Sequence, residues 1–241
     1  MSLVAIDEGF DFEVIVADDA WVFRFPRRSE VVLALEQEAA LLPALADALP
    51  VEVPRFAHIS REPPYVVYPM IHGTPLVDED GDGVRAFLNS LHALDIAELP
   101  VEGTDWVDSY KAQCAVFEGL VFPLLDDPLR AKARTLFDEV DSLTGFEPAL
   151  VHADLGAEHM LVRDGRLAGV IDWADARVGD PALDYAWLLH EPFPDWDVDP
   201  DLRRRTGFYH RLAPFYSVHY GVSTGRPEYA DRALAELASR L

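Results

Sequence analysis

Residues 150–185 constrain the fold more than any other part of the chain, because acids and histidines alternate there with apolar runs. Asp154 follows one apolar run, His159 stands five positions later, and Asp172 directly follows another apolar run. Between the last two, Asp164-Gly165 is a turn signal flanked by apolar residues, which predicts a β-hairpin. Because a hairpin carries the chain out and back, we expect Asp172 to lie close to His159.

The first 72 residues read as strands with one main helix. Short runs of β-branched and aromatic residues predict strands at residues 4–6, 14–16, 21–25 and 65–68. Ser29 is expected to cap a helix that begins at Glu30. Glu38 lies on an otherwise apolar stripe of this helix, where a carboxylate needs a partner. Three prolines then break the pattern: Pro43, Pro50 and Pro54.

After residue 72 the patterns become mainly helical. The predicted helical runs are residues 84–94, 106–122, 128–143 and stretches from 181 to 241. Asp180 precedes a proline and is expected to cap the helix that follows it. The sequence therefore predicts an α+β fold with two lobes. A small β-rich lobe, residues 1–72, is joined by a hinge at residues 69–72 to a larger helical lobe, residues 73–241.

The charge balance narrows the range of partners. The chain has 20 basic and 43 acidic residues, a formal net charge of −23, which argues against nucleic-acid binding. Such a field attracts a polycationic substrate, or serves only to keep the surface soluble. The one cysteine, Cys114, fits a reducing compartment, and no apolar run approaches the roughly 20 residues of a membrane helix. We expect a cytoplasmic protein without membrane contact.

The order of these features resembles the protein-kinase pattern, in which an H-x-D-x-x-x-x-N loop precedes a D-x-G motif. The chain looks most like the aminoglycoside and macrolide phosphotransferases, and the likeness extends over nearly its whole length. The matching segments are Gly9-Phe10-Asp11, WVFRFPRR, LEQEAALL, YPMIHG and GVIDWADARVGDPALDY. The resemblance implies a bilobal protein-kinase-like fold. The first lobe would bind the nucleotide, and the second would hold the catalytic hairpin, the metal site and the acceptor pocket.

The same resemblance assigns roles to residues. Asp154 would be the catalytic base, although alone it could be a turn-capping acid, and His159 and Asp172 would hold Mg²⁺. ATP or GTP would be the phosphate donor. The residues implied to contact it are Arg24, Glu38, Pro69, Met70, Ile71 and His72. Three acids, Asp175, Glu191 and Asp195, are candidates for binding a cationic acceptor, with a solvated surface as the alternative.

Four positions depart from the kinase pattern. His159 replaces an asparagine, as in the branches that modify the aminoglycoside 2''-hydroxyl and in the macrolide kinases. Since imidazole suits softer ions than Mg²⁺, Mn²⁺ is an alternative metal. Arg24 replaces a lysine and adds fork geometry. Gly9 with Phe12 makes a poor glycine-rich loop, and Ala174 replaces the glycine of D-x-G.

The function predicted from the sequence is a small-molecule O-phosphotransferase that moves a nucleotide γ-phosphate to a hydroxyl of an aminoglycoside-like antibiotic. The alternatives are a macrolide 2'-phosphotransferase, or a kinase of a small sugar or amino-alcohol, since the region after Leu188 is short for this family. A pseudokinase that binds nucleotide without transfer is a further alternative, suggested by the poor nucleotide loop.

Overall fold

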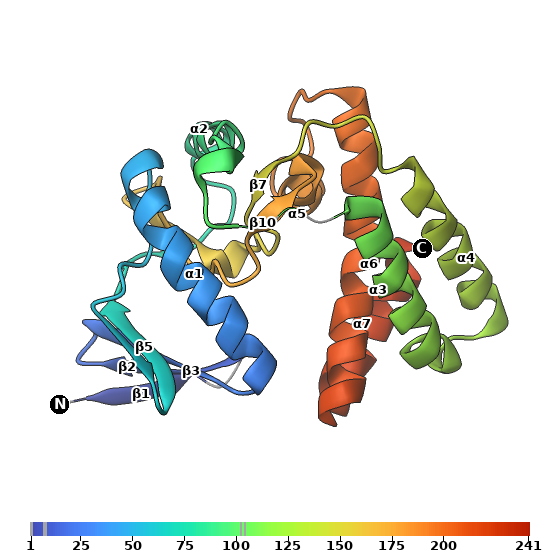
Figure 1. The fold of residues 1–241 in the computed structure, drawn as a ribbon. Helices are drawn as coiled ribbons and strands as arrows, with labels where there is room; N and C mark the ends of the chain where they lie inside the picture. The colour runs from blue at the N-terminus through green and yellow to red at the C-terminus, as the bar shows by residue number, and fades with distance from the viewer. Residues whose placement is uncertain (1, 7–8, 102, 104) are drawn as a thin grey trace. The chain divides into compact units, whose positions relative to one another are not determined.

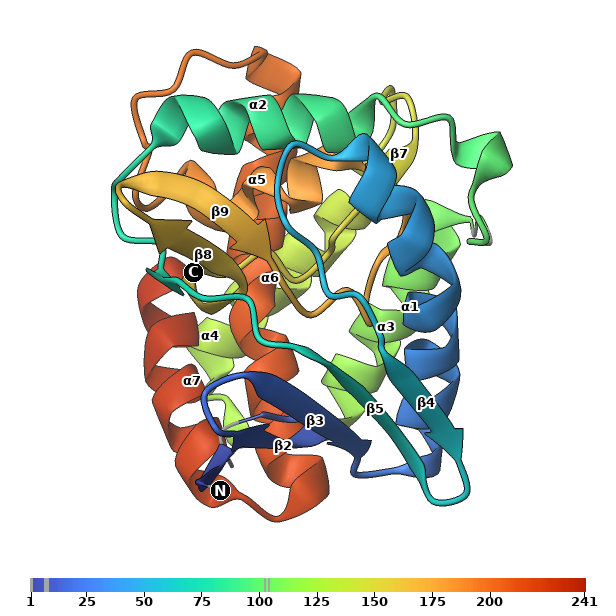
Figure 2. The same cartoon turned by 90° about the vertical axis from the view of Figure 1, so that its left-hand side faces the viewer.

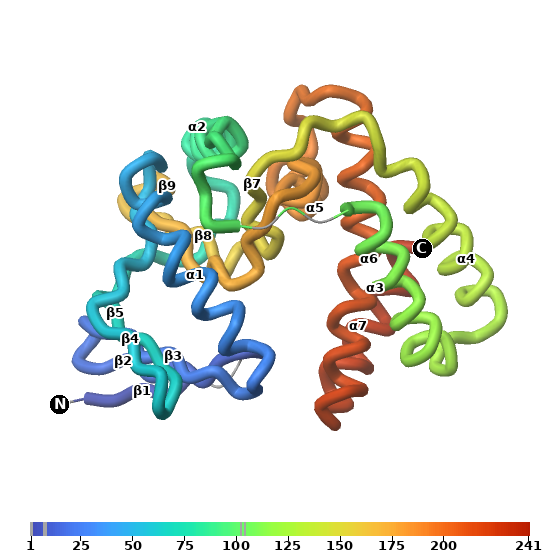
Figure 3. Tube along the Cα trace, in the orientation of Figure 1, coloured from blue at the N-terminus to red at the C-terminus, as the bar shows by residue number. Residues whose placement is uncertain are grey.

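The computed structural model describes residues 2–6, 9–101, 103 and 105–241. Its chain divides into two compact units (Figure 1). The first, the sheet unit, comprises Met1–Glu102 and Ala149–Val178; the second, the helical unit, comprises Gly103–Pro148 and Gly179–Leu241. Figure 3 shows the same chain as a tube, in which β7 follows α3 and α4 in chain order but belongs to the sheet unit. The segment that carries Asp154 and Asp172 therefore belongs to the sheet unit.

A five-stranded antiparallel sheet in the order β1-β2-β3-β5-β4 begins the sheet unit. Its strands are β1 (Leu3–Ile6), β2 (Phe12–Ala17), β3 (Trp21–Pro26), β4 (His58–Arg61) and β5 (Pro64–Pro69). Helix α1 (Ser29–Ala48) packs on this sheet through a cluster that includes Val22, Leu35 and Val66. Burying each such side chain contributes roughly 1.5–3 kcal/mol, which fixes the face that α1 presents to the sheet.

Two details of α1 differ from the predictions. Ser29 does not cap the helix: it is already helical, Arg28 occupies the capping position, and no side chain there bonds an amide. Pro43 does not end the helix, which continues to Ala48. Pro43 is exposed, so water can bond the carbonyl that the missing N–H leaves without a helical partner.

The predicted hairpin is present in the sheet unit. It consists of β8 (Met160–Arg163) and β9 (Arg166–Val170), and β6 (Thr74–Pro75) pairs with β8. Helix α2 (Gly81–His92) lies beside it in both views (Figures 1 and 2). Asp80 joins the two elements, because its carboxylate accepts from Gly83 N in α2 and from Leu167 N in β9. A short ladder of β7 (Ala149–Val151) with β10 (Arg177–Gly179) leads into and out of the hairpin region.

The helical unit is built from four longer helices around an aromatic core. These are α3 (Trp106–Leu120), α4 (Asp127–Asp138), α6 (Pro200–Thr224) and α7 (Pro227–Arg240), with the single turn α5 (Tyr185–Leu188). Phe117 of α3 contacts Phe137 of α4 and Phe215 of α6, so three different helices meet in this core. The predicted helix at residues 128–143 ends at Asp138 and continues as a 3₁₀ turn, Glu139–Ser142.

Asp180 caps the turn Pro181–Leu183, as predicted, by accepting from Ala182 N at 3.0 Å. The structure adds two partners: Arg205 Nε donates to this fully buried carboxylate at 2.7 Å and the Tyr209 hydroxyl at 3.0 Å. Trp106 in turn donates to the Tyr209 oxygen. Asp180 therefore fixes the start of this segment against α6. No helix among the described residues is both long and apolar enough to cross a bilayer.

Candidate active site

The open end of the hairpin brings His159 and Asp172 together. His159 ends a 3₁₀ turn (Ala157–His159) directly before β8, and Asp172 stands two residues after β9. The Ile171 amide donates to the His159 carbonyl at 2.9 Å, which closes the strand pair between them. His159 Nε2 lies 3.7 Å from Asp172 Oδ2. The proximity predicted from the hairpin is therefore present.

His159 is held as one tautomer by the backbone of Asp154. Its Nδ1 lies 2.7 Å from the Asp154 carbonyl, which can only accept, so Nδ1 carries the proton. In the neutral ring the lone pair is then on Nε2, which faces Asp172. Burial lowers the pKa of His159, but the carboxylates of Asp154 and Asp172 act in the opposite direction and outweigh it. The pKa of His159 is therefore raised overall. The ring is oriented to offer Nε2 as a ligand beside a carboxylate.

Asp154 is positioned by a strained turn braced by His152. Ala153 has φ +70° and Asp172 has φ +64°, a region that costs a residue with a Cβ on the order of 1–2 kcal/mol. The buried His152 ring accepts from Asp154 N at 3.3 Å and donates through Nε2 to Ile171 O at 2.9 Å. His152 thus links the turn of Asp154 to the segment of Asp172.

The pKa of Asp154 suits a group that exchanges a proton near neutrality. Its side chain is 58% exposed and lies 3.6 Å from His159 Nδ1 through Oδ2. Desolvation by the surrounding chain raises its pKa to about 6, and the nearby carboxylates of Asp175 and Asp172 act in the same direction. His159 opposes the shift. A carboxylate poised in this way can accept a proton from a bound hydroxyl.

Arg24 on β3 joins Glu38 of α1 to Asp172. One guanidinium nitrogen lies 2.8 and 2.9 Å from the two Glu38 oxygens, and the other lies 2.5 Å from Asp172 Oδ1. Arg24 is 3% exposed and Glu38 is fully buried, so the carboxylate on the apolar stripe has the partner that it needs. The Phe12 ring covers the guanidinium at 4.0 Å.

These contacts shift the pKa values of Arg24, Glu38 and Asp172 in different directions. Burial alone would lower the pKa of Arg24, but Asp172 and Glu38 raise it above its usual value. Burial raises the pKa of Glu38 against the pull of Arg24. Burial would also raise the pKa of Asp172, yet Arg24, His159 and His152 together lower it. Asp172 therefore stays ionised at neutral pH.

The donor set of the reaction site fits a phosphate-bound divalent cation. Asp172 offers carboxylate oxygen and His159 offers imidazole nitrogen, whereas the described residues contain no cluster of three His, Cys, Asp or Glu that could hold a metal. His159 and Asp172 would give such an ion two protein ligands, and phosphotransfer sites usually supply the other ligands of Mg²⁺ from phosphate oxygens and water. The mixed oxygen and nitrogen donors also accommodate Mn²⁺.

The other residues singled out from the sequence lie in three places. In the hinge, Met70 packs against the sheet cluster and its amide donates to Ala20 O. Asp175 is exposed in the segment after Asp172. Desolvation by the surrounding chain raises the pKa of Asp175, although the charge of Arg177 acts to lower it. Two more acids are exposed in the helical unit, on the non-helical segment between α5 and α6: Glu191 and Asp195.

Sequence reasoning missed one contact that shapes the site. Gln37, the neighbour of Glu38 on α1, donates through Nε2 to Ala176 O at 2.8 Å. Glu38 Oε1 also accepts from Trp173 N at 3.2 Å. The two consecutive side chains therefore hold both ends of residues 173–176. The only signal in the sequence was a second polar residue next to a buried acid, which gives no partner.

Comparison with known proteins identifies the family and the fold of this chain. Residues 2–220 match the model of the phosphotransferase enzyme family. Viomycin phosphotransferase from Streptomyces vinaceus is 31% identical over 209 residues, which cover 76% of this chain and 71% of that protein. The GDP and kanamycin complex of the aminoglycoside phosphotransferase APH(2'')-IIIa matches all of this chain and 93% of its own, with TM-score 0.87 and 25% identity.

A macrolide enzyme is also similar. The macrolide 2'-phosphotransferase MphH from Brachybacterium faecium matches 98% of this chain and 92% of its own, with TM-score 0.72 and 25% identity. The predicted resemblance to the aminoglycoside and macrolide phosphotransferases and the predicted protein-kinase-like α+β fold are both confirmed. The chain belongs to the phosphotransferase enzyme family and is a nucleotide-dependent kinase that phosphorylates a small-molecule hydroxyl.

Proposed function

We propose that this kinase transfers the γ-phosphate of ATP or GTP to a hydroxyl of an aminoglycoside-like, cationic antibiotic. The observation that supports the chemistry is the arrangement at the open end of the hairpin. His159 Nε2 faces Asp172 at 3.7 Å while Asp154 lies beside the same ring. The proposed base and the two proposed metal ligands thus lie within one segment, in the chain order of the protein-kinase motifs.

In this mechanism Asp154 orients the acceptor hydroxyl and takes its proton. The hydroxyl oxygen forms a bond to the γ-phosphorus as the bond from phosphorus to the bridging oxygen breaks, and the nucleoside diphosphate leaves. His159 and Asp172 would hold Mg²⁺ or Mn²⁺, which supplies charge neutralisation of the phosphates when bound. Arg24 would donate to the phosphates from the edge that now holds Asp172, while Glu38 keeps its guanidinium in place.

The nucleotide base is assigned to the hinge, Pro69, Met70, Ile71 and His72. We keep the division into a nucleotide-binding lobe, residues 1–72, and a lobe of residues 73–241 as a functional proposal, since the packing of the chain divides it at other residues. The proposal places the enzyme in the cytoplasm, where ATP and GTP are abundant and Cys114 stays reduced.

The acceptor is proposed to be cationic because of the charge of the chain. A net charge of −23 draws polyamines toward the protein, and Asp175, Glu191 and Asp195 offer exposed carboxylates. The similarity to viomycin phosphotransferase and to the kanamycin complex supports a basic antibiotic. The similarity to MphH supports a macrolide as the second candidate. A kinase of a small sugar or amino-alcohol is the third candidate.

The test is a phosphorylation screen with kanamycin, viomycin, erythromycin and ethanolamine as acceptors, each with ATP and GTP. Transfer is followed by mass spectrometry of the acceptor, and nucleotide hydrolysis without acceptor is the control. We expect phosphorylated kanamycin or viomycin. Product from erythromycin or ethanolamine alone would refute the cationic antibiotic assignment. If no acceptor is modified while nucleotide binds, the pseudokinase alternative takes its place.

A further inference from the structure

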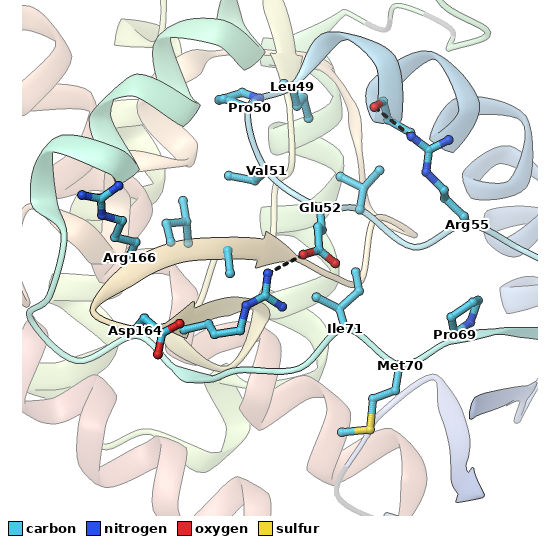
Figure 4. Close-up of a pocket in the computed structure, with 15 residues that line it drawn as sticks. Leu49, Pro50, Val51, Glu52, Arg55, Pro69, Met70, Ile71, Asp164 and Arg166 are labelled. Carbon is cyan, nitrogen blue, oxygen red and sulfur yellow. Dashed lines mark hydrogen bonds and ion pairs between the residues drawn. The ribbon is translucent and has the colours of Figure 1, made fainter. Parts of the chain in front are cut away.

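A second candidate site lies in the sheet unit, on a hollow of about 880 Å³ (Figure 4). Three segments line it: the end of α1 with the linker after it, hinge residues 69–71, and the turn end of the hairpin β8–β9. We call it the hinge hollow. Its volume falls within the roughly 300–1,000 Å³ of small-molecule sites, and most of its lining is apolar with a few charged groups, as in such sites.

The hinge hollow lies away from the proposed base and metal ligands, although Pro69, Met70 and Ile71 line it and also belong to the hinge that is assigned to the nucleotide base. Its lining contains Arg163, Asp164 and Arg166 from the closed end of the hairpin. His159 and Asp172 flank the opposite, open end, and neither they nor Asp154 line the hollow. Each strand of the hairpin is four or five residues long, and a strand rises about 3.3 Å per residue, so the two ends are roughly a dozen ångströms apart.

The apolar wall of the hollow is fixed by backbone bonds. Glu52 N donates to Ala168 O and Val170 N donates to Glu52 O, so the linker after α1 adds to β9 as a parallel bridge. A side chain at Gly169 would meet Ile71 and the Glu52 carbonyl, which shows how tightly hinge, linker and hairpin pack. This frame holds the largely buried side chains of Leu49, Val53, Ile71 and Leu167 along the hollow.

The charge of the lining is opposite to that of the chain. The lining holds three arginines and two acids, although acids outnumber basic residues by more than two to one overall. Glu52 and Arg163 pair at 2.6 Å, and a dashed line from Glu52 marks an ion pair in Figure 4. Arg166 makes no ion pair in the described part of the chain. Arg55 reaches its acidic neighbour Asp47 only at 3.8 Å, with both side chains exposed.

We propose that the hinge hollow binds a small organic anion. Its apolar body would lie on the wall of Leu49, Val53 and Leu167, and its charged group, a carboxylate, sulfonate or phosphate, would be held by the arginines at the rim. Guanidinium groups bind such oxyanions with charge-assisted, often paired hydrogen bonds. An anion would supply the counter-charge that Arg166 lacks among the described residues, whereas a cation or a neutral molecule would not. The occupant is therefore a different class of molecule from the cationic acceptor proposed above.

The probe for the test is 8-anilinonaphthalene-1-sulfonate, a fluorescent organic anion, with its uncharged analogue N-phenyl-1-naphthylamine as the matched ligand. The variant is the charge reversal R55E/R166E, since both side chains are exposed, and the hydrogen bond that it removes among the described residues is the one from Arg55 to Ala46 O at 3.1 Å. The control is R232E, an exposed arginine on α7. We expect the double variant to lose about tenfold or more in affinity for the anion and little for the neutral analogue.

Competition identifies the place and the charged group. Saturating ATP or GTP should leave the fluorescent anion bound, while octanoate or octyl phosphate should displace it. The competitor that displaces it at the lower concentration carries the preferred headgroup, carboxylate or phosphate. The proposal is overturned if R55E/R166E and R232E bind the anion equally, if the neutral analogue binds as tightly, or if nucleotide displaces the probe. None of these outcomes depends on which acceptor the kinase phosphorylates.

Discussion

At the scale of single residues, the reaction site depends on proton positions set by backbone groups. The Asp154 carbonyl accepts from His159 Nδ1 and thereby turns Nε2 toward Asp172. The Asp154 side chain lies 3.6 Å from the same nitrogen, so one residue orients the ligand and presents the proposed base. The two functions use different atoms and can be separated by substitution.

Replacing the carboxylate of Asp154 should stop transfer without disturbing the metal ligand. In Asp154→Asn the backbone carbonyl that orients His159 remains, whereas the base is lost. We expect kcat to fall by about 10²–10⁴-fold, the usual contribution of a general base, with nucleotide affinity nearly unchanged. Steady-state kinetics and nucleotide titration measure the two quantities. The control is Asp164→Asn at the exposed hairpin turn, which should keep full activity; unchanged turnover in Asp154→Asn would reject the base.

The raised pKa of Asp154 predicts an acid limb in the pH–rate profile. The base works only when ionised, and its pKa is raised from 3.8 to about 6. Activity should therefore be full above this value and fall about tenfold per pH unit below it. The measurement is kcat/KM for the acceptor between pH 5 and 8 at saturating metal. A limb near pH 4 would mean that surrounding protein does not shift this carboxyl.

At the scale of elements, α1 holds the segment that follows β9. Glu38 bonds Trp173 N and Arg24, and Gln37 bonds Ala176 O, so one turn of the helix fixes both sides of Asp175. Since Arg24 also bonds Asp172, a displacement of α1 would be transmitted to the proposed metal ligand. The helix and this segment are expected to move together.

Removing the buried acid of this unit should be costly. In Glu38→Gln the Arg24 guanidinium loses its fully buried counter-charge, and breaking one partner of a buried pair typically costs about 3–5 kcal/mol. Urea unfolding measures the change in free energy. The control is Glu36→Gln on the same helix, whose nearest arginine lies at 3.9 Å with both side chains exposed, and which should change stability by under about 1 kcal/mol. Equal effects would contradict the role of burial.

Gln37 tests whether the helix positions Asp172 through the backbone. Gln37→Glu keeps the shape but removes the donor and sets a carboxylate against Ala176 O. We expect the concentration of Mn²⁺ needed for half-maximal activity to rise severalfold, because residues 173–176 lose one of the two bonds to α1. Mn²⁺ binding measured by paramagnetic water relaxation gives a readout independent of turnover. Unaltered Mn²⁺ affinity in this variant, with Gln37→Asn also unchanged, would exclude a positioning role.

At the scale of the whole molecule, the acidic balance governs encounters with charged molecules. With a net charge of −23, the protein attracts cations over distances that salt shortens to about 8–10 Å at physiological ionic strength. An acceptor with several ammonium groups should respond to this field more than one with a single amine.

Ionic strength should therefore separate the two antibiotic classes. Raising the salt from 50 to 500 mM is expected to increase KM for kanamycin or viomycin severalfold and to leave KM for a macrolide nearly constant. The measurement is KM at fixed metal and saturating nucleotide. A salt-independent KM for the polyamine would indicate that local contacts alone bind it, and that the overall charge serves solubility.

How much of the molecule follows from the sequence depends on how far apart the interacting residues lie. The hairpin and the closeness of His159 to Asp172 could be predicted because the turn signal and the residues it joins are near one another in the chain. The contact of Gln37 with Ala176 spans 139 positions and has no local signal. The hinge hollow likewise forms only when the linker, the hinge and the hairpin meet. Ser29 and Pro43 were misjudged because propensity gave way to the packing of α1 on the sheet.

The contact between Arg24 and Asp172 also sets an order of events during synthesis. The two residues are 148 positions apart, and a ribosome that adds about 5–20 residues per second separates their appearance by roughly 7–30 s. A hairpin forms in about 1–10 μs once its strands are available. During the interval Arg24 and Glu38 are made but lack Trp173 and Asp172. The nascent chain thus carries the Arg24–Glu38 pair for many seconds before the segment that contacts it is made.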